Sequence, residues 1–274
     1  RAVLQLVPTT EGVVSWLGRD LTSVSKRVLR KSRRDLQIVF QDPLASLDPR
    51  MTIGASIAEP MLTYENRMPR LQRQDRVREM MEKVGLDPNM INRYPHELSG
   101  GQNQRVGIAR AMILGPKLVI CDEAVSALDV SIQAQIIDLL ISLQKEMDLS
   151  MIFISHDLSV VREVSHRVMV LYLGRVVELA DRGQIYDDAR HPYTQALISA
   201  VPIPDPTIEK SRKRLQLEGD LPSPMDPRAQ LRFLKSKLVD EPDAEQYRPK
   251  LIEVAPGHFV AEHDPIETVL SGSS

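Results

Sequence analysis

The spacing of apolar residues divides much of the chain into alternating strands and helices. Residues 117–123, KLVICDE, form an apolar run that ends in two acids, which is typical of a buried parallel strand whose carboxyl end meets a site. Between Val130 and Met147 apolar residues recur at helical intervals, and residues 150–157, SMIFISHD, repeat the strand pattern with polar groups at its end. This alternation predicts an α/β sheet whose faces are covered by helices.

Further segments along the chain carry local patterns. The opening stretch RAVLQLV has the apolar spacing of a helix, and GVVSWLG, residues 12–18, predicts a short strand. The segment SRRDLQIVFQDP predicts another strand, which Asp42 and Pro43 bring to an end. Residues 166–180, HRVMVLYLGRVVELA, predict two strands that turn at Gly174 and Arg175.

Composition changes along the chain indicate how it is organised. After about residue 202 the sequence is rich in proline and charge, which predicts a main domain over residues 1–201 and a linker with a loop-rich appendage over residues 202–274. Within the main domain we expect a helical subdomain at about residues 52–110, because the polar stretch 61–86 has a single apolar helix face. The residues of that face are Val77, Met80, Met81 and Val84.

Charge and cysteine content exclude several classes of protein. With 35 Lys+Arg against 37 Asp+Glu, the chain is not a general binder of polyanions, so no nucleic-acid partner is expected. The single cysteine, Cys121, excludes an internal disulfide and a thiolate-only metal cage within one chain, which fits a reducing compartment. No apolar stretch approaches the length of a membrane-spanning helix, so we expect any membrane role to go through a partner.

The stretch HELSGGQNQRVGIARAM, residues 96–112, places two glycines before a predicted helix. Gly100 and Gly101 remove side chains from the turn, so backbone N–H groups can approach one anionic group while the helix dipole adds to the attraction. Ser99 supplies a hydroxyl, either as the N-cap or as a direct donor. An isolated Ser-Gly-Gly is more often a plain helix entry, but here LVICDE, SALD and FISHD follow it in order.

This ordered set of motifs resembles the nucleotide-binding subunit of an ATP-binding cassette (ABC) transporter. LSGGQ matches the family signature, LVICDE the Walker B strand, SALD the D-loop and SHD the switch histidine. IVFQDPLASLDPRMTIG matches the Q-loop in the form seen in dipeptide and oligopeptide importers, and RHPYTQALISAVP and EVAPGHFV resemble their C-terminal extension. The resemblance implies a P-loop NTPase-like α/β core with a helical signature subdomain and a loop-rich extension.

The resemblance also implies a role for individual residues. Asp122 would hold Mg²⁺, a hard cation that prefers carboxylate, water and phosphate oxygens. Glu123 would act as the general base that polarises the attacking water. His156 would contact the γ-phosphate and hold the water and Glu123 in register, although a lone histidine after an apolar run is more often structural. Gln41 would reach Mg²⁺ and the water, and would report to the groove where the transmembrane partner docks.

A composite site between two subunits follows from the same resemblance. Ser99, Gly100, Gly101 and Gln102 would grip the γ-phosphate of an ATP held mainly by a second ABC ATPase subunit, and Asp129 would meet the phosphate loop of that subunit. The other implied partners are two transmembrane permease subunits and, indirectly, a solute-binding protein, at the cytoplasmic face of a bacterial inner membrane. Dipeptide, oligopeptide, glutathione, nickel and opine cargoes are all compatible with these residues.

Two departures from the family pattern stand out. No G-x-x-x-x-G-K-[ST] phosphate loop occurs, so we expect that the chain starts just after that loop and that it is inactive alone. The appendage has no cysteine, so no iron–sulfur cluster is expected, and Cys121 is interpreted as a small buried apolar residue. Two other functions remain open: a non-hydrolysing subunit that lends its signature motif to a partner's ATP, and a soluble ABC ATPase outside transport.

Overall fold

The computed structural model divides into two units, which are described separately. The first spans Arg1–His156 and the second Asp157–Ser274. The linker predicted from residue 202 begins outside the described residues, and the predicted domain division stays a prediction. The residues that the structure describes are 1–201, 215–217, 222–223, 226–237, 247–266 and 270–272.

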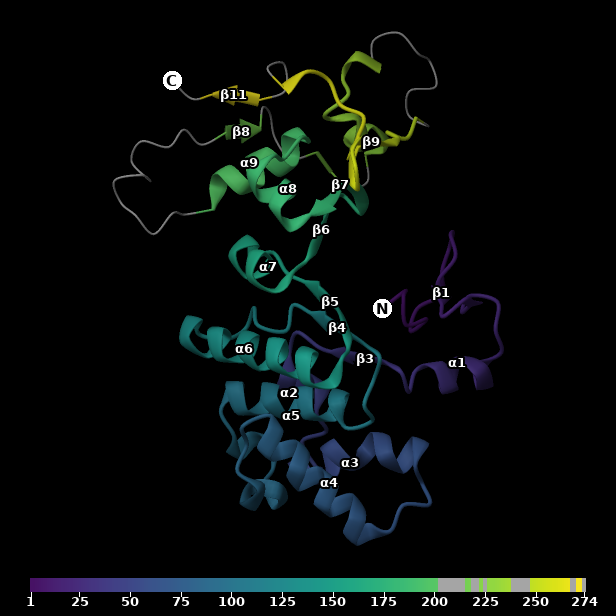
Figure 1. Cartoon of the computed structure of the whole chain (residues 1–274), viewed down its shortest axis with the longest axis vertical. Helices are drawn as coiled ribbons and strands as arrows, with labels where there is room; N and C mark the ends of the chain where they lie inside the picture. Colours follow the sequence, from purple (N-terminus) through teal and green to yellow (C-terminus); the bar gives the residue numbers. More distant parts are fainter. Residues whose placement is uncertain (202–214, 218–221, 224–225, 238–246, 267–269, 273–274) are drawn as a thin grey trace. The chain divides into compact units, whose positions relative to one another are not determined.

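A three-stranded parallel sheet forms the centre of the first unit (Figure 1). Its strands are β3 (Leu36–Val39), β4 (Leu118–Asp122) and β5 (Ser150–Ile154), in the order β3-β4-β5. In β4, Val119 and Cys121 are fully buried, as the continuous apolar run predicts for a central parallel strand. The predicted strands at these positions and the predicted α/β class are therefore confirmed.

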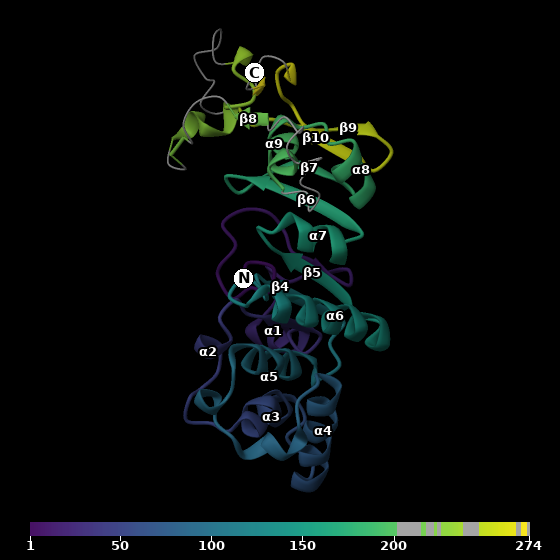
Figure 2. The ribbon, with the colours of Figure 1, turned by 90° about the vertical axis from the view of Figure 1, so that its left-hand side faces the viewer.

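Helix α5 (Gly100–Met112) lies between the sheet and the helices α3 (Ile53–Tyr64) and α4 (Arg70–Lys83), as both ribbon views show (Figures 1 and 2). Most of its residues from Asn103 onward are buried, as expected for a helix that has neighbours on two sides. The remaining short helices of this unit are α1 (Lys26–Ser32), α2 (Pro43–Ser46), η1 (Pro88–Asn92) and η2 (Pro95–Glu97). The apolar face predicted within residues 61–86 belongs to α4 and its C-cap residue, and it is buried. Its residues are Val77, Met80, Met81 and Val84.

Helix α6 (Val130–Met147) matches its predicted bounds. The helix ends where Asp148 takes a left-handed conformation with φ of 50°, which is a common way to close a helix. Its buried residues, which form the apolar stripe that faces the core, are Ile136, Ile137, Leu140 and Leu143.

The helix predicted for the opening RAVLQLV is absent, and this expectation was wrong. Residues 2–5 form a turn, and Gln5 has a φ of 51° that a helix cannot accommodate. The Arg33 guanidinium donates to the carbonyl oxygens of Leu4 and Gln5 at 3.1 and 2.5 Å, so these acceptors are satisfied from outside the segment. Leu4 is buried beside Leu21, and this packing outweighs the weak helical tendency of a seven-residue segment.

The strand predicted over residues 12–18 is confirmed only in part. Ser15–Trp16 form β1, which pairs antiparallel with β2 (Arg19–Asp20). Between them Leu17 and Gly18 have φ values of 48° and 76°, the left-handed pair required by a tight two-residue hairpin.

The second unit is built on an antiparallel sheet of order β6-β7-β10-β9. The two strands predicted over residues 166–180 are confirmed as β6 (Arg167–Tyr172) and β7 (Arg175–Asp181), but the turn residues are Leu173 and Gly174, so Arg175 already belongs to the second strand. The other elements described in this unit are α7 (Leu158–Val164), α8 (Arg182–Asp187), α9 (Pro192–Ala200), β8 (Leu215–Leu217), η3 (Pro227–Leu231), β9 (Leu251–Ala255), β10 (His258–Ala261) and β11 (Leu270–Gly272).

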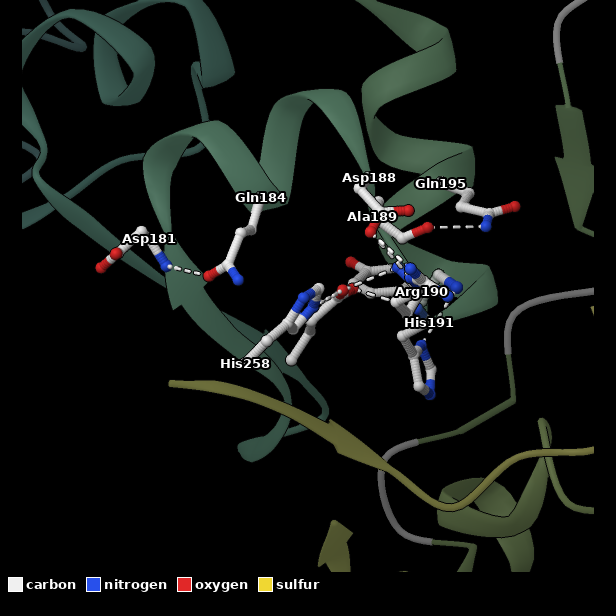
Figure 3. A network of polar contacts seen from close by, with 10 residues as sticks. Asp181, Gln184, Asp188, Ala189, Arg190, His191, Gln195 and His258 are labelled. Atoms are coloured by element: carbon white, nitrogen blue, oxygen red, sulfur yellow. Dashed lines mark hydrogen bonds and ion pairs between the residues drawn. The ribbon is translucent and has the colours of Figure 1, made fainter. Parts of the chain in front are cut away.

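A buried carboxylate on β7 holds three parts of this unit together. Glu178 accepts hydrogen bonds from the backbone N–H groups of Arg190 and His191, at 2.7 and 3.1 Å. The Nε2 of His258 donates to the same carboxylate at 2.7 Å, and both side chains of this pair are almost completely buried. Figure 3 shows His258, Arg190 and His191 converging on this point. The contact ties β10 and the segment before α9 to β7.

Candidate active site

Three residues predicted as catalytic meet at the carboxyl ends of the three parallel strands. Gln41 lies two residues after β3, Glu123 directly after β4 and His156 two residues after β5. The Gln41 Nε2 donates to Glu123 Oε2 at 2.8 Å, and the His156 Nδ1 lies 3.5 Å from Glu123 Oε1. Parallel strands bring their carboxyl ends to one edge, which explains why residues so distant in sequence converge here.

Glu123 keeps free acceptor capacity at this edge. Its side chain is 29% exposed, and the side chain of His156 is 72% exposed, so both groups are open to solvent. Each carboxylate oxygen has two acceptor positions; Gln41 occupies one on Oε2, while His156 lies 3.5 Å from Oε1, beyond the usual hydrogen-bond length. The carboxylate can therefore still accept a proton or a hydrogen bond from a water molecule or substrate.

The backbone of Glu123 is strained and held from several sides. Its φ is 50°, a left-handed conformation that costs about 1 to 3 kcal/mol for a residue other than glycine. Its N–H donates to the carbonyl oxygen of Ile154 at 3.0 Å, while the N–H and the hydroxyl of Ser126 donate to its carbonyl oxygen at 3.1 and 3.0 Å. The left-handed conformation comes directly after the end of β4. Sequence reasoning did not identify Ser126 as the residue that supports it.

The signature segment forms the N-terminus of α5. Ser99 is the N-cap: its Oγ accepts from the N–H of Gln102 at 3.3 Å, and its own N–H donates to Gln102 Oε1 at 2.9 Å. This reciprocal capping box satisfies the N–H groups of Ser99 and Gln102, and it leaves the first-turn N–H groups of Gly100 and Gly101 without an intrahelical acceptor. Ser99 and Gly100 are exposed.

The two glycines of this segment differ in the space around them. A Cβ added to Gly101 would lie 2.6 Å from the Ile132 side chain, so the absence of a side chain allows α5 to approach the first turn of α6. A Cβ on Gly100 would meet only Leu128, at 3.8 Å. The packing requirement at Gly101 was not recognised in the sequence. Asp129, the N-cap residue of α6, is exposed and its side chain makes no capping bond.

The predicted site residues therefore fall into two groups on the first unit. One contains Gln41, Glu123 and His156, with Asp122 preceding Glu123 at the end of β4 and only partly buried. The other contains Ser99 to Gln102 at the start of α5, and this segment lies next to the first turn of α6, whose N-cap residue is Asp129. Both groups have exposed members and neither is packed into the core.

Cys121 has the properties of a core residue, as predicted. Its side chain is fully buried, and burial raises the pKa of its thiol to about 12. Among the described residues no group of three or more His, Cys, Asp or Glu side chains is arranged to hold a metal ion on its own. In the same part of the chain, no helix has the length and apolar character needed to cross a bilayer.

A cavity of about 290 Å³ in the first unit lies outside the predicted site. Phe40 and Tyr64 line it together with the charged groups Arg33, Glu59 and Arg110. Burial lowers the pKa of Arg110, while the nearby Glu59 carboxylate acts in the opposite direction. These residues come from separate elements and follow no spacing that the sequence could reveal.

Comparisons with known proteins place this geometry in a family. The family model described as ABC transporter matches residues 1–126, and the model described as Oligopeptide/dipeptide transporter, C-terminal region, matches residues 177–233. The oligopeptide transport ATP-binding protein OppF of Salmonella typhimurium is 57% identical over 251 residues, which are 92% of this chain and 75% of that protein. AppF of Bacillus subtilis is 48% identical, over 96% of this chain and 80% of its own length.

A solved structure shares the fold. The ATP-binding cassette MJ0796, described as a dimer in a post-hydrolysis state bound to ADP and Pi, is similar with a TM-score of 0.59 and 31% identity, over 65% of this chain and 77% of that one. The resemblance seen in the motifs is therefore confirmed at the level of sequence and of fold. The chain belongs to the ATP-binding proteins of ABC transporters, within the oligopeptide OppF-like subfamily.

Proposed function

We propose that this protein, in its intact form, is the ATP-binding and ATP-hydrolysing subunit that drives the import of oligopeptides through an ABC transporter. The oligopeptide cargo is supported by the similarity to OppF proteins and by the match of residues 177–233 to the oligopeptide/dipeptide C-terminal region. Hydrolysis is supported above all by Glu123, whose strained backbone presents an accessible carboxylate between Gln41 and His156.

In this proposal Glu123 is the general base. A positioned base within hydrogen-bond reach of a water contributes about 10² to 10⁴ in rate. The amide of Gln41 fixes one oxygen of the carboxylate, and the imidazole of His156 lies beside the other. His156 is mostly exposed, so it can turn toward a phosphate that enters the site from solvent.

The donor set at this edge fits Mg²⁺, which takes few protein ligands and completes its shell with water and phosphate oxygens. Asp122 offers a carboxylate, and Gln41 offers its Oε1, because its Nε2 already donates to Glu123. When bound with ATP, Mg²⁺ would neutralise charge that develops on the phosphates. The chain itself contributes the two oxygens and orients them from the ends of adjacent strands.

The signature segment is proposed to bind the terminal phosphate of an ATP on a second ATPase subunit. The N–H groups of Gly100 and Gly101, the Ser99 hydroxyl and the helix dipole of α5 all suit an anion. Gln102 supports Ser99 through the capping box, and the free Asp129 carboxylate would meet the phosphate loop of that subunit. We further propose that two membrane permeases and a solute-binding protein complete the complex, with this subunit on the cytoplasmic face of the membrane.

The decisive experiment compares Glu123→Gln with the wild-type protein in the intact transporter. We expect ATP turnover to fall by about 10² to 10⁴ while ATP binding is retained, since the amide cannot accept the proton. Asp138→Asn, at an exposed position of α6, is the matched control and should leave turnover unchanged. Unchanged hydrolysis in Glu123→Gln would favour the non-hydrolysing role and exclude the assignment of the base.

A further inference from the structure

The residue that follows the signature segment is a buried asparagine. Asn103 is 1% exposed, and its backbone N–H donates to the carbonyl oxygen of Ser99 at 2.9 Å, as in any helix. Its side chain makes two further hydrogen bonds: Nδ2 donates to the carbonyl oxygen of Pro95 at 2.9 Å and to that of Leu98 at 3.4 Å. One residue thus binds three carbonyl groups of the segment that leads into α5.

These bonds connect that segment to the body of the helix. The other hydrogen bonds described within residues 94–98 are local: the N–H of Tyr94 donates to the Glu97 carboxylate, the N–H of Glu97 to the carbonyl oxygen of Tyr94, and the N–H of Leu98 to that of Pro95. Such bonds shape the segment but do not fix its direction relative to α5. The buried Asn103 amide supplies that constraint.

We propose that Asn103 is a positioning residue for the signature segment. By holding Pro95 and Leu98 against α5, its amide sets the angle at which the chain enters the helix. That angle determines where the Ser99 hydroxyl lies relative to the N–H groups of Gly100 and Gly101 in the first turn of α5. The inference rests on the proposed function, because it deepens the role given there to the signature segment in binding ATP across the subunit interface.

The chemistry of the site makes an asparagine side chain a good choice. Two carbonyl oxygens lie near the same point, and the amide nitrogen of asparagine has two N–H bonds to donate to them. An aspartate of the same shape would place carboxylate oxygens against carbonyl oxygens and would push the segment away from α5. Asn103→Asp therefore changes the entry angle with little change in volume.

The test measures steady-state hydrolysis against ATP concentration in the intact transporter carrying Asn103→Asp. Because the signature segment acts when ATP closes the two subunits, before the water is activated, we expect KM for ATP to rise at least fivefold and kcat to stay within threefold. Hydrogen exchange at residues 99–102 should become faster. Asn89→Asp makes the same chemical change at an exposed position of the same subdomain and should alter none of these quantities.

A KM within twofold of the wild-type value in a folded Asn103→Asp protein would overturn the inference. If this variant does not fold, Asn103→Ser, which keeps a single donor, is measured by the same criteria. Failure of both variants to fold would assign Asn103 a purely structural role.

Glu123→Gln, measured in parallel, separates the positioning role of Asn103 from the proposed function. Unchanged hydrolysis in Glu123→Gln removes the proposed function itself, whereas loss of hydrolysis there with an unchanged KM in Asn103→Asp removes only the positioning role.

Discussion

The two units each contain a glutamate paired with a histidine, and the pairs differ in every physical respect. In the first unit, Glu123 and His156 lie 3.5 Å apart, with side chains that are 29% and 72% exposed. In the second unit, Glu178 and His258 lie 2.7 Å apart, with exposures of 0% and 1%. Glu123 follows the end of its strand with a left-handed backbone, while Glu178 lies within strand β7, next to a shift of register in the pairing with β6.

The difference shows how the environment decides what a carboxylate can do. Glu178 is buried and accepts three hydrogen bonds, one from His258 and two from backbone N–H groups, so little of it remains for another molecule. A buried carboxylate is tolerated only when it is satisfied in this way. Glu123 has fewer contacts and is open to water. The same pair of residue types therefore suits chemistry in one unit and structural cohesion in the other.

The largest expected difference between the two glutamates is in their contribution to the free energy of unfolding. Removal of one member of a buried pair costs about 3 to 5 kcal/mol, because the other polar groups lose their partner in a dry environment. We expect Glu178→Ala to lower the free energy of unfolding by that amount, since His258 and two backbone N–H groups lose their acceptor. Urea unfolding of the second unit, followed through hydrogen exchange of β7 and β10, measures the effect.

Glu123→Ala is the matched variant for this measurement. It should leave the free energy of unfolding nearly unchanged or raise it, because alanine removes an exposed carboxylate and gives no new buried polar group. An equal loss of stability in Glu178→Ala and Glu123→Ala would contradict the proposal that only the buried glutamate holds the fold together.

The second contrast concerns pH and the buried imidazole of His191. Burial, and to a lesser extent the charge of His263, lowers the pKa of His191 from 6.5 to about 3. Below pH 6.5 the imidazole of His191 binds a proton in the unfolded chain but stays neutral in the folded chain. The contribution of His191 to the free energy of unfolding is therefore fully present above pH 6.5 and is lost as the pH falls toward 3. The free energy of unfolding decreases by at most about 1.4 kcal/mol per pH unit, which amounts to about 2 kcal/mol at pH 5.

The His191→Asn variant isolates this effect. Asparagine keeps an acceptor for the N–H of Tyr193, which His191 Nδ1 caps at 3.1 Å, but it does not titrate. Denaturation at pH 7, 6 and 5 should therefore show a smaller loss of stability in the variant than in the wild type. His166→Asn, at an exposed position, should retain the wild-type slope. If the free energy of unfolding of His191→Asn changed with pH as much as that of the wild type, His191 would not be the group responsible.

The open site could be predicted from sequence to a larger extent than the buried pair. The apolar run of β4 and the helical period of α6 located these elements, and the family resemblance implied that Gln41, Glu123 and His156 act at one site. Glu178 and His258 are 80 residues apart and meet through an antiparallel sheet whose order has no local signal. The opening RAVLQLV was mispredicted because its carbonyl groups are satisfied by Arg33, a distant side chain.

The third contrast is between two glycines of α5, Gly101 and Gly107. Gly101→Ala should lower stability by about 1 to 3 kcal/mol, since its Cβ would meet the Ile132 side chain at 2.6 Å. Gly107→Ala should raise stability by about 0.5 to 1 kcal/mol, because a Cβ there meets nothing within 4 Å and alanine favours a helix. Thermal unfolding of both variants measures the difference, and equal shifts would argue against close packing of α5 on α6.

The smallest expected effect belongs to His156, and it is the sharpest test of the open site. Its contact with Glu123 spans 3.5 Å in a solvent-exposed position, and exposed ion pairs contribute about 0 to 1 kcal/mol. His156→Ala should therefore change the free energy of unfolding by less than about 0.5 kcal/mol, as is usual for surface positions. A loss above about 1 kcal/mol would place His156 with the structural histidines such as His258, and its position beside Glu123 would then contribute to folding.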